Sequence, residues 1–294
     1  MKRLSDNILL LGNTNFNYYL AGQKEAVIIE CGMTAGVSLL AEQWASLPQK
    51  PEVKYILAMH SHFDHVCGIA MLKTLFPSAL AVGSARTQKI LTSDKVKQAL
   101  KRADDIVTAA YIKNGLLKEK PADLNIELLG IDLCVGDGDS LNLGNDLKID
   151  IFETPGHSPC SISAYFEQDK AMFLSDAAGY RDDSGLMSPV FFQDYELYIN
   201  SIKRIMDIPT EILGVGHGKV CTGKEVQEYY KDGLLAAQEA FAEIKSKLEK
   251  GISEEAVTTE LFAKYITGAL AYYPEDMMLG SMYQLVKSVK NCLT

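Results

Sequence analysis

All five histidines of the chain lie in sequence settings that suit a metal ligand. Three of them fall in one hexapeptide, His60-Ser-His-Phe-Asp-His65, with the pattern H-x-H-x-D-H. The other two follow an apolar run and a glycine, in Thr154-Pro-Gly-His157 and Gly214-Val-Gly-His217. Neutral imidazole binds Zn, Fe and Mn, and nearby carboxylates add hard oxygen ligands. A lone histidine is usually a packing or surface residue, but this density predicts a metal site.

The candidate ligands follow the ends of predicted strands, and such side chains can converge on one edge of a sheet assembly. In an extended segment, positions i and i+2 face the same way, so the first two histidines of the hexapeptide can hold one metal. The chain must then turn, so Asp64 and His65 can address a neighbouring metal. Seven ligands suffice for two metals about 3.5–4 Å apart. The predicted set is His60, His62, Asp64, His65, His157, Asp176 and His217.

The patterns that position these residues predict a mixed α/β (α+β) chain. Short runs rich in Val, Ile and Tyr predict strands at residues 8–11, 18–20, 26–29, 53–59, 79–82, 147–152, 162–166, 171–174 and 212–215. Helices are predicted at residues 34–45, 68–75 and 193–205. Residues 89–120 are charged and helical in pattern, and Pro121 closes them. We interpret residues of about 84–121 as a helical insertion.

From Thr222 onward the strand signals stop. Thr222-Gly-Lys-Glu225 fits a capping box that opens a helix, which apolar residues at spacings of three and four continue to Gly251. Two further helices are predicted at about residues 253–266 and from Pro274 onward. The sequence therefore predicts a domain of residues 1–221 and a C-terminal helical appendage of residues 222–294 that covers the active site.

Composition excludes some classes of partner. The net charge of −9 disfavours a nucleic-acid partner, which needs a basic face for the phosphates. No apolar run approaches the ~18–20 residues that span a bilayer, and the first residues lack the apolar run of a signal peptide. The six cysteines are dispersed and form no C-x-x-C pair, so we expect a cytoplasmic protein with reduced thiols. Faces rich in Tyr and Met on the last helices suit a homodimer contact.

The histidine motifs resemble those of the metallo-β-lactamase superfamily over about residues 7–221. The resemblance implies an αββα sandwich, two β-sheets flanked by helices, that holds two divalent metal ions (Zn, Fe or Mn). It further implies catalytic roles for Asp64 and Asp176, which orient the nucleophile through the metals. Glu30 stands where many members have an Asp that supports the first histidine loop. The implied first metal position is His60, His62 and His157, the second is Asp64, His65 and His217, and Asp176 bridges them.

Other residues point to a branch of that family. Flavodiiron oxidoreductases carry Glu at the position of His62, so the resemblance favours the hydrolytic branches. Three short segments are similar to PqsE-like 2-aminobenzoylacetyl-CoA thioesterases: Ser84-Ala-Arg-Thr87, Ser188-Pro-Val-Phe-Phe192 and Leu279-Gly-Ser-Met282. This resemblance implies C-terminal helices over the active-site entrance and a substrate contact at Ser281. Tyr180, which replaces an acidic residue of that pocket, and Phe192 are further candidates for substrate binding.

The resulting hypothesis is a dinuclear metallohydrolase that cleaves an acyl thioester of the CoA type through a metal-bridging hydroxide. Thiolate is a good leaving group, so a strong general acid is not essential. Open alternatives are a lactonase, a phosphodiesterase, a mononuclear-iron dioxygenase of the same fold, and a partner-binding regulator. The substrate is expected to be a small-molecule ester or thioester, whose acyl group the sequence does not name.

Overall fold

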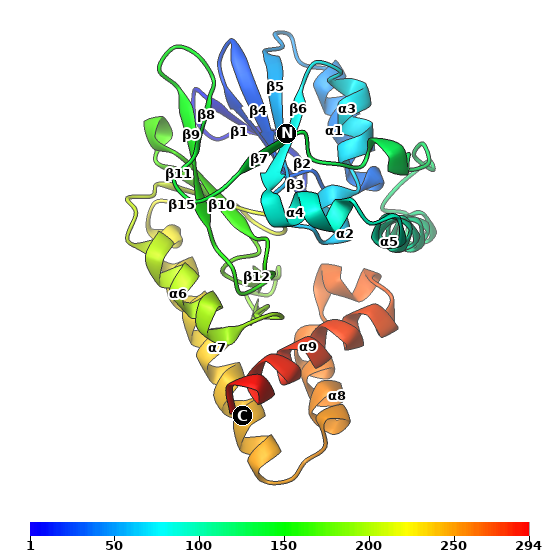
Figure 1. Cartoon of the computed structure of the whole chain (residues 1–294), viewed down its shortest axis with the longest axis vertical. Coiled ribbons are helices and arrows are strands. Elements are labelled where there is room, and N and C mark those ends of the chain that lie inside the picture. The colour runs from blue at the N-terminus through cyan, green and yellow to red at the C-terminus, as the bar shows by residue number, and fades with distance from the viewer. Residues whose placement is uncertain (294) are drawn as a thin grey trace.

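Two β-sheets pack face to face, and helices cover the outer side of each, in the computed structural model of the chain (Figure 1). The structure describes residues 1–293, with Ala269 described by its backbone only. The first sheet has the order β1 (Lys2–Arg3), β2 (Ile8–Asn13), β3 (Phe16–Gly22), β4 (Glu25–Ile29), β5 (Glu52–Leu57), β6 (Leu80–Ser84) and β7 (Leu133–Val135). The second has the order β15 (Cys221–Thr222), β14 (Ile212–Val215), β11 (Ala171–Ser175), β10 (Ile162–Phe166), β9 (Lys148–Glu153) and β8 (Ser140–Asn142).

Alternating side chains explain why the sheets stack. Successive residues of a strand face opposite sides, so a strand buried on both faces is apolar throughout. In β4, Val27 and Ile29 join the core between the two sheets, whereas Ala26 and Ile28 join the core under the helices of the first sheet. The inter-sheet core also holds Phe173 of β11. The apolar runs of the sequence therefore specify a sandwich with helices on both outer faces.

Helices of the N-terminal half cover the first sheet, and later helices cover the second (Figure 1). The first group is α1 (Thr34–Ala45), α2 (Phe63–Val66), α3 (Ile69–Leu75), α4 (Ala85–Leu91) and α5 (Asp94–Lys113). The second group begins with α6 (Tyr195–Met206) and α7 (Lys224–Glu249). Short 3-10 turns η1 (Ile126–Leu128) and η2 (Glu167–Asp169) and a small sheet of β12 (Tyr180–Arg181) and β13 (Met187–Ser188) complete the connections.

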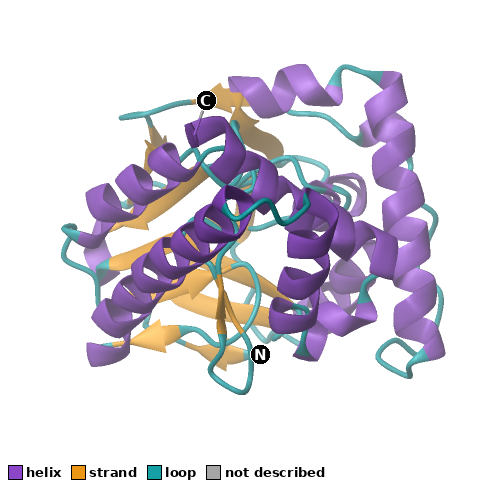
Figure 2. Cartoon of the chain, turned by 90° about the horizontal axis from the view of Figure 1, so that it is seen from below, coloured by secondary structure: helices purple, strands orange, loops and turns teal. Residues whose placement is uncertain are grey.

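The C-terminal helices lie across one end of the sandwich (Figure 2). After α7 come α8 (Glu254–Tyr265), η3 (Gly268–Tyr272) and α9 (Glu275–Leu293). Met278, Met282, Leu285 and Val289 of α9 are buried, as their spacing predicts. Among the described residues, no helix combines the length and apolarity that crossing a membrane requires.

The predicted fold class, an αββα sandwich with C-terminal helices, is confirmed. The predicted helix at 34–45 and the strand at 162–166 have the bounds of α1 and β10. The predicted capping box is wrong: Thr222 pairs with Ile212 in β15, and Gly223, with φ 58°, precedes α7 without a side-chain cap. The division at residues 221 and 222 stays a prediction.

Candidate metal centre

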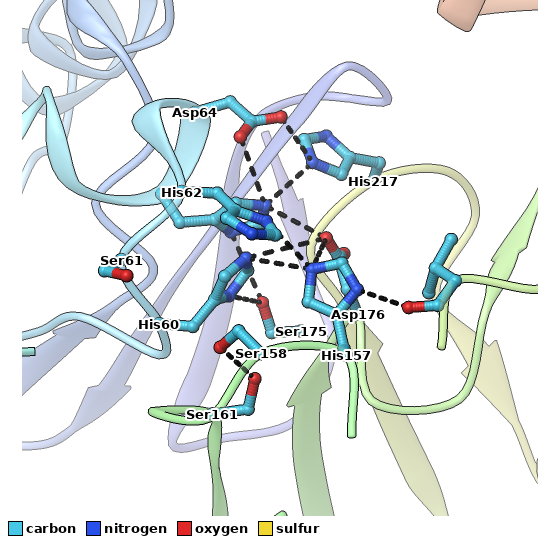
Figure 3. Close-up of polar contacts among 12 residues, drawn as sticks. His60, Ser61, His62, Asp64, His157, Ser158, Ser161, Ser175, Asp176 and His217 are labelled. Atoms are coloured by element: carbon cyan, nitrogen blue, oxygen red, sulfur yellow. Dashed lines mark hydrogen bonds and ion pairs between the residues drawn. The ribbon is translucent and has the colours of Figure 1, made fainter. Parts of the chain in front are cut away.

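Seven side chains from four segments of the chain meet at one end of the sandwich, and Figure 3 shows how most of them point toward one another. His60 follows β5, and the chain then turns into α2, where His62 is the residue before the helix. Asp64 and His65 lie on α2 itself, so one short segment provides four of the seven groups. The other three follow strands of the second sheet: His157 after β9, Asp176 after β11 and His217 after β14.

Three imidazoles form the first group. His157 Nε2 lies 3.2 Å from His60 Nε2 and 3.0 Å from His62 Nδ1. Their rings are 4.6–4.8 Å apart, edge to face. Three nitrogens at such separations point to one common centre.

The second group lies directly beside the first. His65 Nε2 is 3.1 Å from His217 Nε2, and Asp64 Oδ2 is 3.5 Å from the same His217 atom. Asp176 Oδ2 lies between the groups, 3.2 Å from His65 Nε2 and 3.5 Å from His157 Nε2. One carboxylate oxygen therefore faces both groups, which is the position of a bridging ligand.

The outer nitrogens of the rings are held by the fold. His157 Nδ1 lies 2.8 Å from the Val190 carbonyl, and His217 Nδ1 lies 2.6 Å from the Asn15 carbonyl. His65 Nδ1 lies 2.9 Å from Glu30 Oε2. Metal-binding histidines show this pattern, because a partner on the outer nitrogen fixes the tautomer and aims the inner nitrogen at the metal.

The donor set fits divalent metals. Ligands at about 2.0–2.1 Å from a tetrahedral metal lie about 3.4 Å from one another. The separations of 3.0–3.5 Å within the cluster match that value. Imidazoles and carboxylates are ligands for Zn, Fe and Mn alike. The cluster therefore indicates divalent metal binding.

Backbone features bring these groups close. A Cβ on Gly216 would lie 2.8 Å from His65 Cε1 and 3.1 Å from Asp176 Oδ1, so the position leaves no room for a side chain. The Asn17 amide donates to the carbonyls of Val215 and Gly218, which fixes the loop of His217. The glycine and the two hydrogen bonds thus fix the positions of His65, Asp176 and His217 in the cluster.

Electrostatics divide the histidines into two kinds. Burial lowers the pKa values of His60, His62 and His157, aided by neighbouring imidazoles, and the pKa of His62 falls to about 3. Burial alone would also lower the pKa of His65, but the carboxylates of Glu30, Asp176 and Asp64 raise it well above its usual value. The first group is therefore neutral near pH 7, whereas His65 tends to hold a proton.

A cavity of about 790 Å³ opens above the cluster. Its floor includes His62, Asp64, His157, Asp176 and His217. Its walls come from α5 and α9, which lie far apart in sequence, and their side chains are mostly apolar: Val96, Ala99, Leu100, Ala103, Met277, Met278 and Met282. Apolar walls around a few converging polar groups are typical of a small-molecule site.

The sequence model of the metallo-beta-lactamase superfamily matches residues 12–217, which include all seven of these side chains. This chain belongs to the metallo-β-lactamase superfamily. Protein ST1585 of Sulfurisphaera tokodaii, a metallo-beta-lactamase fold-containing protein, is 24% identical over 219 residues, covering 74% of this chain and 77% of that protein. The hydroxyacylglutathione hydrolase of Klebsiella pneumoniae is 30% identical over 190 residues, covering 64% of this chain and 54% of the enzyme. This chain thus spans about half the length of that relative.

Solved structures of superfamily members share the fold over nearly the whole chain. Metallo-beta-lactamase family protein TTHA1429 from Thermus thermophilus has a TM-score of 0.67 at 16% identity, covering 99% of this chain and 95% of its own. The ST1585 structure has a TM-score of 0.61 at 18% identity, covering 98% and 99%. Since these identities are low, the likeness concerns the fold. The resemblance to PqsE-like thioesterases stays a prediction.

The three predicted substrate-binding residues of this superfamily member line the cavity. Tyr180 and Ser281 are part of its wall, and the Phe192 ring lies 5.2 Å from the His157 ring. Phe191, its neighbour, is instead fully buried in the core between the second sheet and its helices. Their roles in substrate binding stay predictions.

Sequence reasoning missed Ser175 and Tyr273. The hydroxyl of Ser175 lies 3.4 Å from His60 Nδ1 and 3.3 Å from His65 Nδ1, so it touches both groups. The sequence offers one indication of Ser175, which directly precedes the candidate ligand Asp176. The hydroxyl of Tyr273 reaches Asp64, although Tyr273 lies outside the segment that matches the superfamily. No motif marks it, because only the folded C-terminal segment brings it to the site.

Proposed function

We propose that this protein is a dinuclear metal-dependent hydrolase that cleaves an acyl thioester. The observation that carries the proposal is the shared position of Asp176 Oδ2 between two groups of ligands at the floor of an apolar cavity. One group of imidazoles would hold the first metal and the group of Asp64, His65 and His217 the second. Two bound metals would supply Lewis acidity toward a carbonyl oxygen and toward the attacking water.

The protein's own side chains orient the reacting groups, bind the acyl group and exclude water. Asp176 and Asp64 would help to hold the metals and so orient the reacting groups, and the hydrogen bonds on the outer nitrogens of His157 and His217 keep these rings from rotating. The walls of α5 and α9 take up an apolar acyl group and exclude water, which strengthens every polar interaction at the floor. Because a thiolate leaves readily, the reaction needs no strong general acid.

The lining of the cavity supports an apolar acyl group. Among the described residues that line the cavity, Lys95 is the one lysine or arginine, so few side chains there could bind a phosphodiester backbone. The nucleotide part of a CoA ester would remain outside. Relatives named hydroxyacylglutathione hydrolase, acting on a thioester, add support for this bond type.

A lactonase is the second candidate. Tyr180 lines the cavity and follows Asp176 by four positions, and its phenol would be a proton donor for the ring oxygen of a lactone. Turnover of acyl-CoA thioesters and of lactones of matched acyl length distinguishes the two candidate functions. A thioesterase should prefer the thioesters, and a lactonase should prefer the lactones.

The first test is to count metal atoms per chain in freshly purified protein by elemental mass spectrometry, followed by turnover of these thioesters and lactones. About two atoms of Zn, Fe or Mn and turnover of thioesters are expected.

The variant His62→Ala should lose at least about 100-fold in kcat, because one ligand of the first metal is gone, while its circular dichroism stays unchanged. One iron per chain would instead favour a dioxygenase, and no metal with no turnover would favour a partner-binding regulator. Full turnover by His62→Ala would refute the mechanism.

A further inference from the structure

A tyrosine from the C-terminal segment contacts the metal cluster. The phenol of Tyr273 donates a hydrogen bond to Asp64 Oδ2 at 3.2 Å, across 209 positions of sequence. Tyr273 lies between η3 and α9, where the chain turns toward the cavity that it helps to line. Since the ionised carboxylate has no hydrogen to give, the phenol is the donor.

The ring of Tyr273 is held as firmly as its hydroxyl. The residue is 9% exposed and belongs to the core under the helices of the first sheet. The ring packs edge to face against Phe63, at 5.9 Å between centroids. Phe63 and Asp64 are neighbours on α2, so Tyr273 holds that helix through both an apolar and a polar contact.

The two oxygens of Asp64 face different partners. Oδ1 lies 3.9 Å from His65 Nε2, and Oδ2 lies 3.5 Å from His217 Nε2. The hydrogen bond from Tyr273 to Oδ2 opposes a turn of the carboxylate that would move this oxygen away from His217. Contacts of this type on a ligating carboxylate tune metal affinity.

We propose that Tyr273 is a positioning residue for the second metal position, where it fixes the Asp64 carboxylate. The proposal rests on the dinuclear site proposed above. It follows that the C-terminal segment forms part of the metal site as well as a wall of the cavity. Because Tyr273 contacts Asp64 of the second group and its neighbour Phe63, the first metal position should not depend on it.

The test is stepwise metal binding by Tyr273→Phe, which removes the hydroxyl and keeps the ring against Phe63. Titration of metal-free protein with Zn²⁺ against a competing chelator should show an unchanged first affinity and a second affinity weaker by about 10–100-fold. The Co²⁺ absorption spectrum should change for the second equivalent only. Tyr272→Phe is the matched control, because Tyr272 is the adjacent tyrosine and its ring faces Tyr111 rather than Asp64.

Thermal melting in excess chelator checks that Tyr273→Phe folds. A second measurement needs no variant: amide hydrogen exchange of residues 266–274 in the natural protein should slow on the second equivalent of metal and not on the first. This follows because coupling between metal and segment is reciprocal.

The outcomes separate the two proposals. If the natural protein binds fewer than two metals, the dinuclear hydrolase fails whatever the variant does. If it binds two, and Tyr273→Phe binds the second with the natural affinity, the role of Tyr273 is overturned. The role of Tyr273 would also be overturned if the amide exchange rates of residues 266–274 did not change on the second equivalent of metal.

Discussion

At the scale of single residues, the two groups of histidines differ in charge although their rings are in contact. The first group is buried among imidazoles, which disfavours the protonated form. His65 is equally buried, but three carboxylates surround it and favour its protonated form. The sequence shows identical residue types, so this difference depends on the carboxylates around His65, foremost Glu30, which follows β4 of the first sheet.

The difference predicts that the two metals bind with different pH dependence. The pKa values of His65 and His217 are both raised, so the second metal must displace protons that these rings hold, and its affinity should rise at least about tenfold per pH unit near neutrality. The first metal meets imidazoles that are already neutral, so its affinity should stay nearly constant there. Calorimetry of Zn²⁺ binding in buffers of different ionisation enthalpy measures the protons released at each step. Equal release at both steps would contradict the assignment of charge.

Glu30 offers a direct check of this electrostatic argument. Its carboxylate lies 2.9 Å from His65 Nδ1, and Glu30→Gln keeps the size of the side chain while removing the charge. The pKa of His65 should fall in the variant, which reduces the protons released with the second metal. The matched control is Glu25→Gln. It changes a carboxylate that pairs with Lys54 and lies away from the site. A variant that releases as many protons as the natural protein would show that Glu30 does not set the charge of His65.

At the scale of elements, the sequence predicts the long strands and therefore the loops that carry the ligands. The period of two and the apolar runs identify strands such as β10, whose burial is complete. Two-residue strands such as β12 and β15 have no period to detect, because their pairing depends on neighbours brought by the fold. The capping-box prediction failed for the same reason: the backbone of Thr222 is engaged in a sheet.

The loop of His157 shows how one element fixes another. Gly156 has φ +128°, and a Cβ there would lie 2.3 Å from the backbone of Tyr198 in α6. Gly156→Ala should therefore lower the free energy of unfolding by about 3 kcal/mol, through strain and a forced shift of α6. Gly185→Ala is the control, since Gly185 also has positive φ, +92°, but open space around it, and should cost about 1 kcal/mol. Urea unfolding of both measures the difference, and equal values would mean that the contact with α6 is unimportant.

At the scale of the whole molecule, the convergence of the candidate ligands could be predicted from the sequence, whereas the residues that line the cavity could not. The ligands are chemically rare residues in a dense motif, and strand periodicity places them at one edge. The cavity instead combines α5 with α9, and nothing in either helix pattern indicates which face meets the other. Like the cavity, the role of Tyr273 could not be predicted, because its contact with Asp64 forms only when the folded C-terminal segment crosses the site.

The cavity between α5 and α9 should set the length of the acyl group. Ala103 lines it, and Ala103→Phe replaces a methyl group by a ring that fills part of its volume. The kcat/KM for long acyl thioesters should fall at least about tenfold, or ~1.4 kcal/mol in transition-state binding, while short acyl thioesters should react as before. Ala109→Phe is the control, since Ala109 is exposed on the same helix and is not among the lining residues of the cavity. Equal loss for all chain lengths would place the damage in the metal centre, and no loss would mean that the acyl group binds elsewhere.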